Sequence, residues 1–259
     1  FSLDHIKRLT DDTGIIQHAK FGIPNLKDGY CLDDNARALL MAIMAYKQLK
    51  SNEALELCPI YLSYIHYMQL DNGKFRNFLS FKREFLDEEG SEDSFGRAVW
   101  ALGYLLGNPP NDAYFQSGSE IFFKAAQNFE SLSSLRSIAY TIMGISHYLG
   151  MNKSDENMIQ IMTRLSKKLT DQYTICRTEN WKWYENIMSY DNGIIPLGLL
   201  HAEIFVKGKK IKEVAFETMD FLTETCIKDN SLSIIGNQNW YEKGKERSRF
   251  AQQPVDALA

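Results

Sequence analysis

Apolar residues recur along most of the chain at the i, i+3, i+4, i+7 spacing of helices that bury one face. The pattern predicts helices over residues 34–50, 53–69, 95–107, 112–129, 133–150, 154–171, 192–207 and 209–228. The alternation typical of β-strands is scarce. Short connections such as GNPPND alternate with long ones of about twenty residues, rich in Gly, Asn and Trp. This arrangement predicts hairpins of helices.

The long connections resemble one another, since each runs from an Asp through an aromatic loop to a second Asp. The leading residues Asp12, Asp71, Asp171 and Asp229 are 59, 100 and 58 residues apart, and the middle gap contains a loop-poor helix start, SSLRSIAYTIMG. One repeat is therefore about 50–60 residues long. Such hairpins stack because none can bury its apolar face alone.

Every second helix is apolar nearly all round, as in ARALLMAIMAY, RAVWALGYLLG, YTIMGISHYLG and IIPLGLLHAEI. Helices of this kind belong in an inner ring that an outer ring covers. We therefore predict an all-α toroid of (α/α)6 type, complete or partial, in which residues 1–259 form a single domain. The long loops then lie on one face, at the starts of the inner helices. The final residues, QQPVDALA, read as a helix cut short, so we expect the native protein to continue.

Composition and charge exclude several classes of function. The formal net charge of −4 disfavours nucleic acid as a ligand, and no apolar run approaches the roughly 18 residues of a membrane span. The four cysteines are far apart and form no cluster with histidines at metal spacing. We therefore expect buried free thiols, no bound metal and no cofactor. Reduced thiols favour the cytoplasm, and the absence of an initiator Met leaves the periplasm open.

Carboxylates gather where inner helices begin: Asp33, Asp34, Glu92, Asp93 and Asp191. Helix N-termini stabilise carboxylates, so each of them can be a structural cap. In a toroid, however, these helix starts face one cavity, and glycosidic-bond cleavage requires converging carboxylates. We take Asp34, Asp93 and Glu185 as the candidate acid, base or nucleophile.

Two helix starts repeat an acid and an arginine four residues apart, Asp33 with Arg37 and Asp93 with Arg97. Such a pair can be a salt bridge worth a few tenths of a kcal/mol. On helices this apolar, we favour an arginine that orients a carboxylate or a ligand oxygen. Asn35, within the same DDNAR segment, joins the candidate substrate-binding residues.

The segment NWKWYENIMSYDN gathers aromatic and polar side chains before an inner helix. Sugar rings stack on aromatic rings through their C–H faces, while Asp and Asn bind hydroxyls. The candidate sugar-binding residues here and in the next repeat are Trp181, Trp183, Tyr184, Tyr190, Asp191, Asn192, Trp240 and Gln253. The alternative is a surface loop pinned by buried tryptophans.

The first long loop adds Asp12, Gln17, His18 and Tyr30 to the candidate substrate-binding residues. His18 is the histidine least explained by packing, because His66, His147 and His201 lie within helical patterns. A histidine in a loop can bind a hydroxyl or transfer a proton.

The segments HIKRLTDDTGIIQHA, GYCLDDNARA, GRAVWALG and WKWYENIMSYDN occur together. Through them the chain resembles the six-hairpin glycosidase superfamily of (α/α)6 toroids. More narrowly, it is similar to bacterial glycan-handling proteins that occur alone or fused to glycosyltransferase domains. The resemblance implies the toroid fold, an activity of hydrolase or glycosyltransferase type, and a glycosyltransferase as a possible partner.

Three functions stay open. The leading hypothesis is a glycoside hydrolase or phosphorylase that acts on an oligosaccharide in a cleft lined with carboxylates and aromatic rings. The second is a sugar epimerase or isomerase, which resembles the N-acylglucosamine epimerase group and needs two facing bases; His18 and His201 are the candidate pair. The third is a non-catalytic glycan-binding module that serves a glycosyltransferase.

Overall fold

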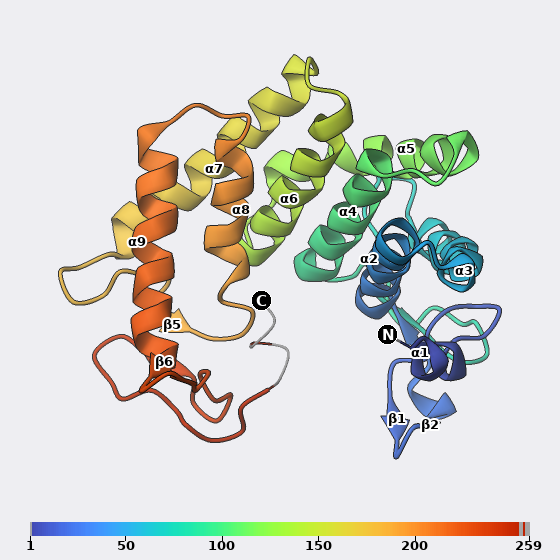
Figure 1. Cartoon of the computed structure of the whole chain (residues 1–259), viewed down its shortest axis with the longest axis horizontal. Helices are drawn as coiled ribbons and strands as arrows, with labels where there is room; N and C mark the ends of the chain where they lie inside the picture. Colours follow the sequence, from blue (N-terminus) through green and yellow to red (C-terminus); the bar gives the residue numbers. More distant parts are fainter. Residues whose placement is uncertain (1, 254–255, 257–259) are drawn as a thin grey trace. The chain divides into compact units, whose positions relative to one another are not determined.

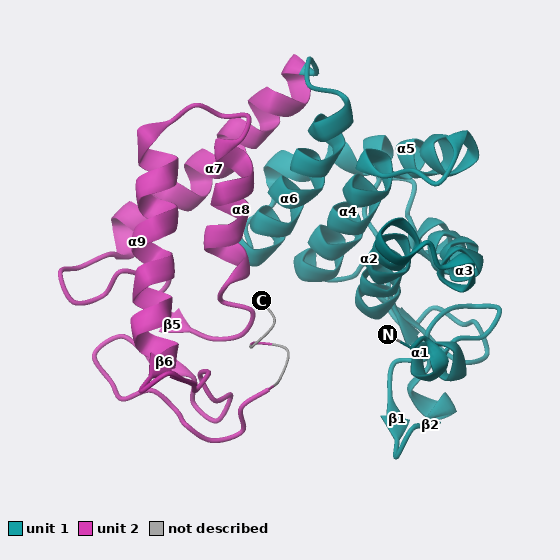
Figure 2. Cartoon of the chain, viewed as in Figure 1, with its two compact units in different colours: residues 1–155 teal, residues 156–259 magenta. Residues whose placement is uncertain are grey.

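A computed structural model describes residues 2–253 and 256. These residues contain nine α-helices and only two-residue strands, so the all-α prediction is confirmed. The chain divides into two compact units, residues 1–155 and residues 156–259 (Figure 2).

Unit 1 contains six α-helices and two short antiparallel ribbons. The helices are α1 (Asp4–Leu9), α2 (Leu32–Leu49), α3 (Asn52–Met68), α4 (Glu92–Gly107), α5 (Asp112–Ala126) and α6 (Leu135–Met151). The ribbons pair β1 (Ala19–Lys20) with β2 (Ile23–Pro24) and β3 (Tyr30–Cys31) with β4 (Phe78–Leu79). Two 3-10 turns, η1 (Leu26–Asp28) and η2 (Phe129–Ser131), complete the connections.

Helices α2, α4 and α6 form the inner layer of unit 1 (Figure 1). Helix α4 packs against both α2 and α6, while α3 packs on α2 and α5 packs on α4. The inner helices bury their apolar residues almost completely, as at Leu39, Leu102 and Ile142. The prediction of apolar helices covered by outer ones is confirmed within this unit.

Glycines allow α4 and α6 to approach closely. A Cβ atom added at Gly103 would lie 2.1 Å from the carbonyl oxygen of Gly144, and one at Gly96 would lie 2.8 Å from the Cα of Ser137. Since Gly96 and Ser137 both lie near helix starts, the two helices run parallel. Their N-terminal turns therefore lie side by side.

Unit 2 contains α7 (Glu156–Cys176), α8 (Ile194–Glu203) and α9 (Lys209–Cys226). Helix α8 packs against α7 and α9. Two ribbons pair β5 (Ile187–Met188) with β8 (Tyr241–Glu242) and β6 (Ile227–Lys228) with β7 (Ser231–Leu232). The long loops before α8 and after α9 are thus joined through β5 and β8.

All eight predicted helices occur, with bounds shifted by a few residues. Periodicity missed α1 because its six residues are too few to show a pattern. Helix α7 runs to Cys176, so Asp171 lies inside it and does not lead a loop as predicted. The expected helix over QQPVDALA falls mostly outside the described residues, and the single toroid domain stays a prediction.

The four cysteines are free, three of them buried and Cys176 half-buried. No helix in the described part of the chain is both long and apolar enough to cross a membrane.

Candidate functional site

The starts of α2, α4 and α6 repeat one arrangement of side chains. Each N-cap side chain accepts the backbone N–H three residues further on, and the caps are Cys31, Ser91 and Ser134. The sixth residues after these caps are, in order, Arg37, Arg97 and Tyr140. Parallel helices therefore present three equivalent positions next to one another.

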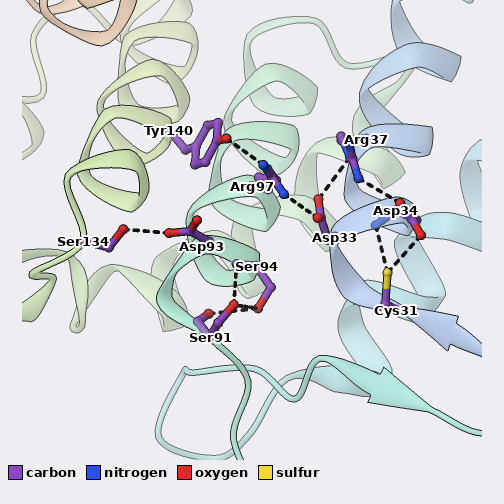
Figure 3. Close-up of polar contacts among 10 residues, drawn as sticks. All are labelled: Cys31, Asp33, Asp34, Arg37, Ser91, Asp93, Ser94, Arg97, Ser134 and Tyr140. Carbon is purple, nitrogen blue, oxygen red and sulfur yellow. Dashed lines mark hydrogen bonds and ion pairs between the residues drawn. The ribbon is translucent and has the colours of Figure 1, made fainter. Parts of the chain in front are cut away.

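Asp33 links these positions (Figure 3). Its Oδ1 lies 3.0 Å from Nε of Arg37 on the same helix, and its Oδ2 accepts a hydrogen bond from Arg97 on α4. Arg97 also donates to the Tyr140 hydroxyl of α6 at 2.9 Å, and its guanidinium lies 5.0 Å from the Tyr140 ring centroid. One network thus joins all three inner helices of unit 1. The Asp33–Arg37 pair expected from the sequence is confirmed.

This network is partly withdrawn from solvent, since the Arg97 side chain is 13% exposed and that of Asp33 is 22% exposed. Burial raises the pKa of Asp33, and the positive charges of Arg97 and Arg37 oppose this rise. Charges in such surroundings interact more strongly than they do in water. The Arg97 guanidinium can therefore stabilise negative charge that develops on a nearby ligand oxygen.

Asp34 extends the row toward β3. It accepts a hydrogen bond from Arg37 at 2.9 Å and one from the Cys31 thiol at 3.0 Å. Burial raises the pKa of Cys31, so this thiol remains a proton donor at neutral pH. Asp34 is therefore a partly exposed carboxylate that accepts hydrogen bonds from Arg37 and Cys31.

Glu92 and Asp93 connect α4 to the start of α6. Glu92 accepts the backbone N–H groups of Ser133, at 2.8 Å, and Ser134, at 2.5 Å. Asp93 accepts the Ser134 hydroxyl at 2.6 Å. Glu92 thus binds the N–H groups before the neighbouring helix α6, whereas the cap of its own helix is Ser91 and not an acid as weighed in the sequence.

Asn35 is placed differently from the prediction. It is fully buried, its side-chain amide donates to the carbonyl of Cys31 at 2.9 Å, and its Oδ1 accepts the N–H of Ile15 at 2.9 Å. A Cβ atom at Gly14 would lie 2.4 Å from that oxygen. Asn35 therefore anchors the first loop and has no surface for a substrate, because only a short polar side chain can satisfy both backbone groups there.

Two candidates of the first loop have partners of their own. Tyr30 is 1% exposed and donates to Asp11 at 2.6 Å; burial and this hydrogen bond raise the pKa of Tyr30 to about 12. Asp12 is exposed and pairs with Arg83 at 2.8 Å, and this hydrogen bond lowers the pKa of Asp12. Tyr30 belongs to the core, whereas Asp12 ties two loops together.

The two histidine candidates, His18 and His201, belong to different units. His18 is largely exposed, and its Nδ1 lies 3.4 Å from the Asp28 carboxylate. The neighbouring Gln17 is half-buried and donates its backbone N–H to Gly29. His201 lies in the last turn of α8, and burial lowers its pKa. A facing pair of bases stays a prediction.

Three of the aromatic residues predicted to bind sugar lie inside unit 2. Trp181 is 2% exposed, whereas Trp183 and Tyr184 are fully buried. Trp181 packs edge-on against Phe221, and the Tyr184 hydroxyl is 2.9 Å from that of Thr218. Their positions match the alternative weighed above, a loop pinned by buried aromatic rings.

The other aromatic candidates of unit 2 remain accessible. Tyr190 is 37% exposed, and its ring centroid lies 6.4 Å from that of the half-buried Trp240. The side chain of Glu185 is also half-buried, and its carbonyl accepts the indole N–H of Trp181. The structure therefore brings Tyr190 and Trp240 together at the surface.

The polar candidates next to α8 support the loop. Asp191 is buried, has a left-handed φ of 47°, and donates its backbone N–H to Asp256. Asn192 is also buried and donates its side-chain amide to the carbonyl of Ser189. Gln253 is exposed at the end of the described range.

Sequence reasoning missed Tyr140 and the thiol of Cys31. Tyr140 lies six residues after its cap, as Arg97 does, but its segment SSLRSIAYTIMG lacks the long loop that marks the other repeats. An alignment by N-cap position would have revealed it. No group of three or more His, Cys, Asp or Glu residues in the described ranges is arranged to hold a metal ion.

Comparisons by sequence and by structure differ in outcome. No family model matches the chain, and a search of curated proteins finds no match. Among solved structures, a sugar epimerase from a ruminal bacterium has a TM-score of 0.70 at 14% identity, covering 95% of this chain and 76% of that chain.

Two further solved structures are similar. Cellobiose 2-epimerase from Bacillus thermoamylovorans B4167 has a TM-score of 0.70 at 12% identity, covering 90% of this chain and 71% of that chain. A D-mannose isomerase has a TM-score of 0.69 at 11% identity, with coverages of 92% and 71%. At these identities the likeness shows the fold, an all-α toroid of helical hairpins, as predicted.

Proposed function

We propose that this chain epimerises or isomerises a sugar at the row of polar side chains where α2, α4 and α6 begin. The observation that carries the proposal is Arg97, held between the Asp33 carboxylate and the Tyr140 hydroxyl in partly buried surroundings. The similar structures, a sugar epimerase, a cellobiose 2-epimerase and a D-mannose isomerase, favour this chemistry over hydrolysis.

The proposed reaction moves protons only and needs no redox partner. A base removes the proton from C2 of the open-chain sugar, next to the C1 aldehyde. The C–H electron pair forms a C1=C2 double bond, and the oxygen on C1 takes the negative charge. When a second acid returns a proton to the other face of C2, the C1 aldehyde forms again and the product is the epimer. When the base returns its proton to C1 and the proton of the C2 hydroxyl passes to the oxygen on C1, the product is the ketose.

We assign separate tasks to the residues of the row. The guanidiniums of Arg97 and Arg37 stabilise the charge on the C1 oxygen, which is the group that changes most during the reaction. Asp33 acts through Arg97 and is a positioning residue. Asp34, partly exposed and paired with Arg37, is the carboxylate that we assign to proton transfer.

Hydrolysis is the competing function. It requires two carboxylates about 5–10 Å apart across the scissile bond. The candidates for that role were Asp34, Asp93 and Glu185, of which Asp93 accepts a hydrogen bond from Ser134. The hydrogen bonds of Asp34 with Arg37 and of Asp93 with Ser134 are compatible with either reaction, and a glycosyltransferase partner stays a prediction.

Product analysis with matched variants tests the proposal. The wild-type chain, Arg97→Ala and Arg83→Ala are incubated with glucose, mannose, fructose and cellobiose, and the sugars are separated by anion-exchange chromatography. Arg83 is the control because it is an exposed loop arginine paired with Asp12. We expect a new epimer or ketose from the wild type and from Arg83→Ala, and a rate lowered about 100-fold or more by Arg97→Ala. Released monosaccharide from cellobiose would indicate hydrolysis and would contradict the proposal.

A further inference from the structure

One aromatic ring beside the row makes no ring contact among the described residues. Phe78 on β4 is 39% exposed, and no aromatic or cationic side chain of residues 2–253 packs on its ring. The neighbouring rings of the same loop do have aromatic partners: Phe81 stacks on Tyr30 at 6.3 Å, and Phe85 stacks on Tyr67 at 5.0 Å. Part of the Phe78 ring is therefore exposed to water, and neither an aromatic ring nor a cation of the described residues covers it.

The backbone of Phe78 is fixed from both sides. Its N–H donates to the Asp87 carboxylate at 2.9 Å, and its carbonyl accepts the N–H of Leu86 at 3.1 Å. It is also paired with Cys31 in the β3–β4 ribbon. A ring held in this way loses little entropy when a ligand binds to it.

The register of the ribbon places Phe78 on the side of the carboxylates. Directly opposed residues of antiparallel strands lie on the same face, with Cβ atoms about 5 Å apart. Cys31, the partner of Phe78, directs its thiol to Asp34 at 3.0 Å. This register places the Cβ atom of Phe78 about 5 Å from that of Cys31, whose thiol contacts Asp34 at the end of the row away from Tyr140.

We infer that Phe78 is a platform for a second sugar ring, so the substrate is a disaccharide or longer. The inference rests on the proposed function, because it assumes that the reacting unit binds at Arg97. The adjoining pyranose then extends past Asp34 and stacks its C–H face on the ring of Phe78. This residue sets affinity for the second unit and takes no part in the proton transfer.

A kinetic split tests this role. Phe78→Ala should raise KM for a disaccharide about three- to tenfold, leave its kcat unchanged, and leave KM for a monosaccharide unchanged. Phe78→Trp should restore the disaccharide KM. The control is Phe81→Ala, which removes an exposed ring of the same loop that stacks on Tyr30 and is not paired with Cys31 in the register of the ribbon. Equal effects of Phe78→Ala and Phe81→Ala would overturn the inference.

Binding measured without catalysis separates this inference from the proposed function. Saturation-transfer NMR with cellobiose reports contact with the wild-type chain, Phe78→Ala and Phe81→Ala. A signal that only Phe78→Ala weakens supports the platform, even where no epimer or ketose forms. Cellobiose that does not bind the wild type, or binds Phe78→Ala equally well, contradicts it.

Discussion

The contact between α4 and α6 predicts a large effect from one methyl group. In Gly103→Ala, the new Cβ atom would lie 2.1 Å from the carbonyl oxygen of Gly144, about 1.3 Å inside ordinary contact distance. The obstacle is the backbone of the neighbouring helix, so the helices themselves must separate. Overpacking of this kind costs about 1–3 kcal/mol, and the better helix propensity of Ala offsets at most about 1 kcal/mol.

The matched control is Gly150→Ala, a glycine of α6 whose added Cβ atom has no neighbour within 4 Å. Because the added methyl group meets no neighbour, Gly150→Ala should raise the free energy of unfolding by about 0.5–1 kcal/mol through the better helix propensity of Ala. Urea titrations monitored by circular dichroism give the free energy of unfolding of the wild type and of each variant. Gly103→Ala should be less stable than wild type. It should also lose activity, because Arg97 and Tyr140 bond across the same interface at 2.9 Å. Equal stability of the two variants would refute the reasoning.

Three further predictions concern buried polar groups. Asn35→Ala leaves the N–H of Ile15 without its acceptor, so urea titrations should show a loss of about 1–3 kcal/mol, and no loss would contradict the anchor role. Because the pKa of Tyr30 is raised from 10.0 to about 12, its contribution is complete below pH 10.0 and is lost as pH rises toward 12; Tyr30→Phe should flatten this decline in alkaline melts. Burial lowers the pKa of His201 below 6.5, so the unfolded chain takes up a proton first and stability falls as pH drops through 6.5. His201→Gln should weaken that acid dependence in thermal melts, and an unchanged dependence would count against it.

The helices could be predicted from the sequence because a helix that buries one face must carry apolar residues at a period of about 3.6 residues. The small residues of α4 and α6 similarly indicated an inner position, and their glycines make the close contact. Helix starts were predicted to within about three residues, but their caps were not: the acids were weighed as caps, whereas the structure has Cys31, Ser91 and Ser134 there. Such features depend on neighbours within one or two turns.

The spacing of residues along one helix did not predict which side chains bond to each other across different helices. Spacing suggested Asp93 as a partner for Arg97, and it gave no sign that Arg97 bonds to Asp33 on α2. Its reach across the layer depends on how closely α2 and α4 pack, which no local pattern encodes. The choice of partner is thus a tertiary property.

Aromatic residues gave the least reliable guide to the site. Trp183 and Tyr184 were predicted to face a sugar, yet both are fully buried, whereas Phe78 in a less notable segment is exposed. The sequence shows that aromatic residues are present in these loops, but whether they are buried depends on which helices and strands cover each loop. Only the register of β3 with β4 pairs Phe78 with Cys31, whose thiol contacts Asp34.

Proton exchange at C2 tests the central proposal most directly. The wild-type chain and Arg97→Ala are incubated in D2O with each sugar of the panel, and ¹H NMR follows the C2 proton. We predict that the wild type replaces this proton with deuterium in one substrate as its epimer or ketose appears, and that Arg97→Ala slows the exchange about 100-fold or more. A sugar that binds but keeps its C2 proton, or is cleaved with that proton retained, would contradict the account.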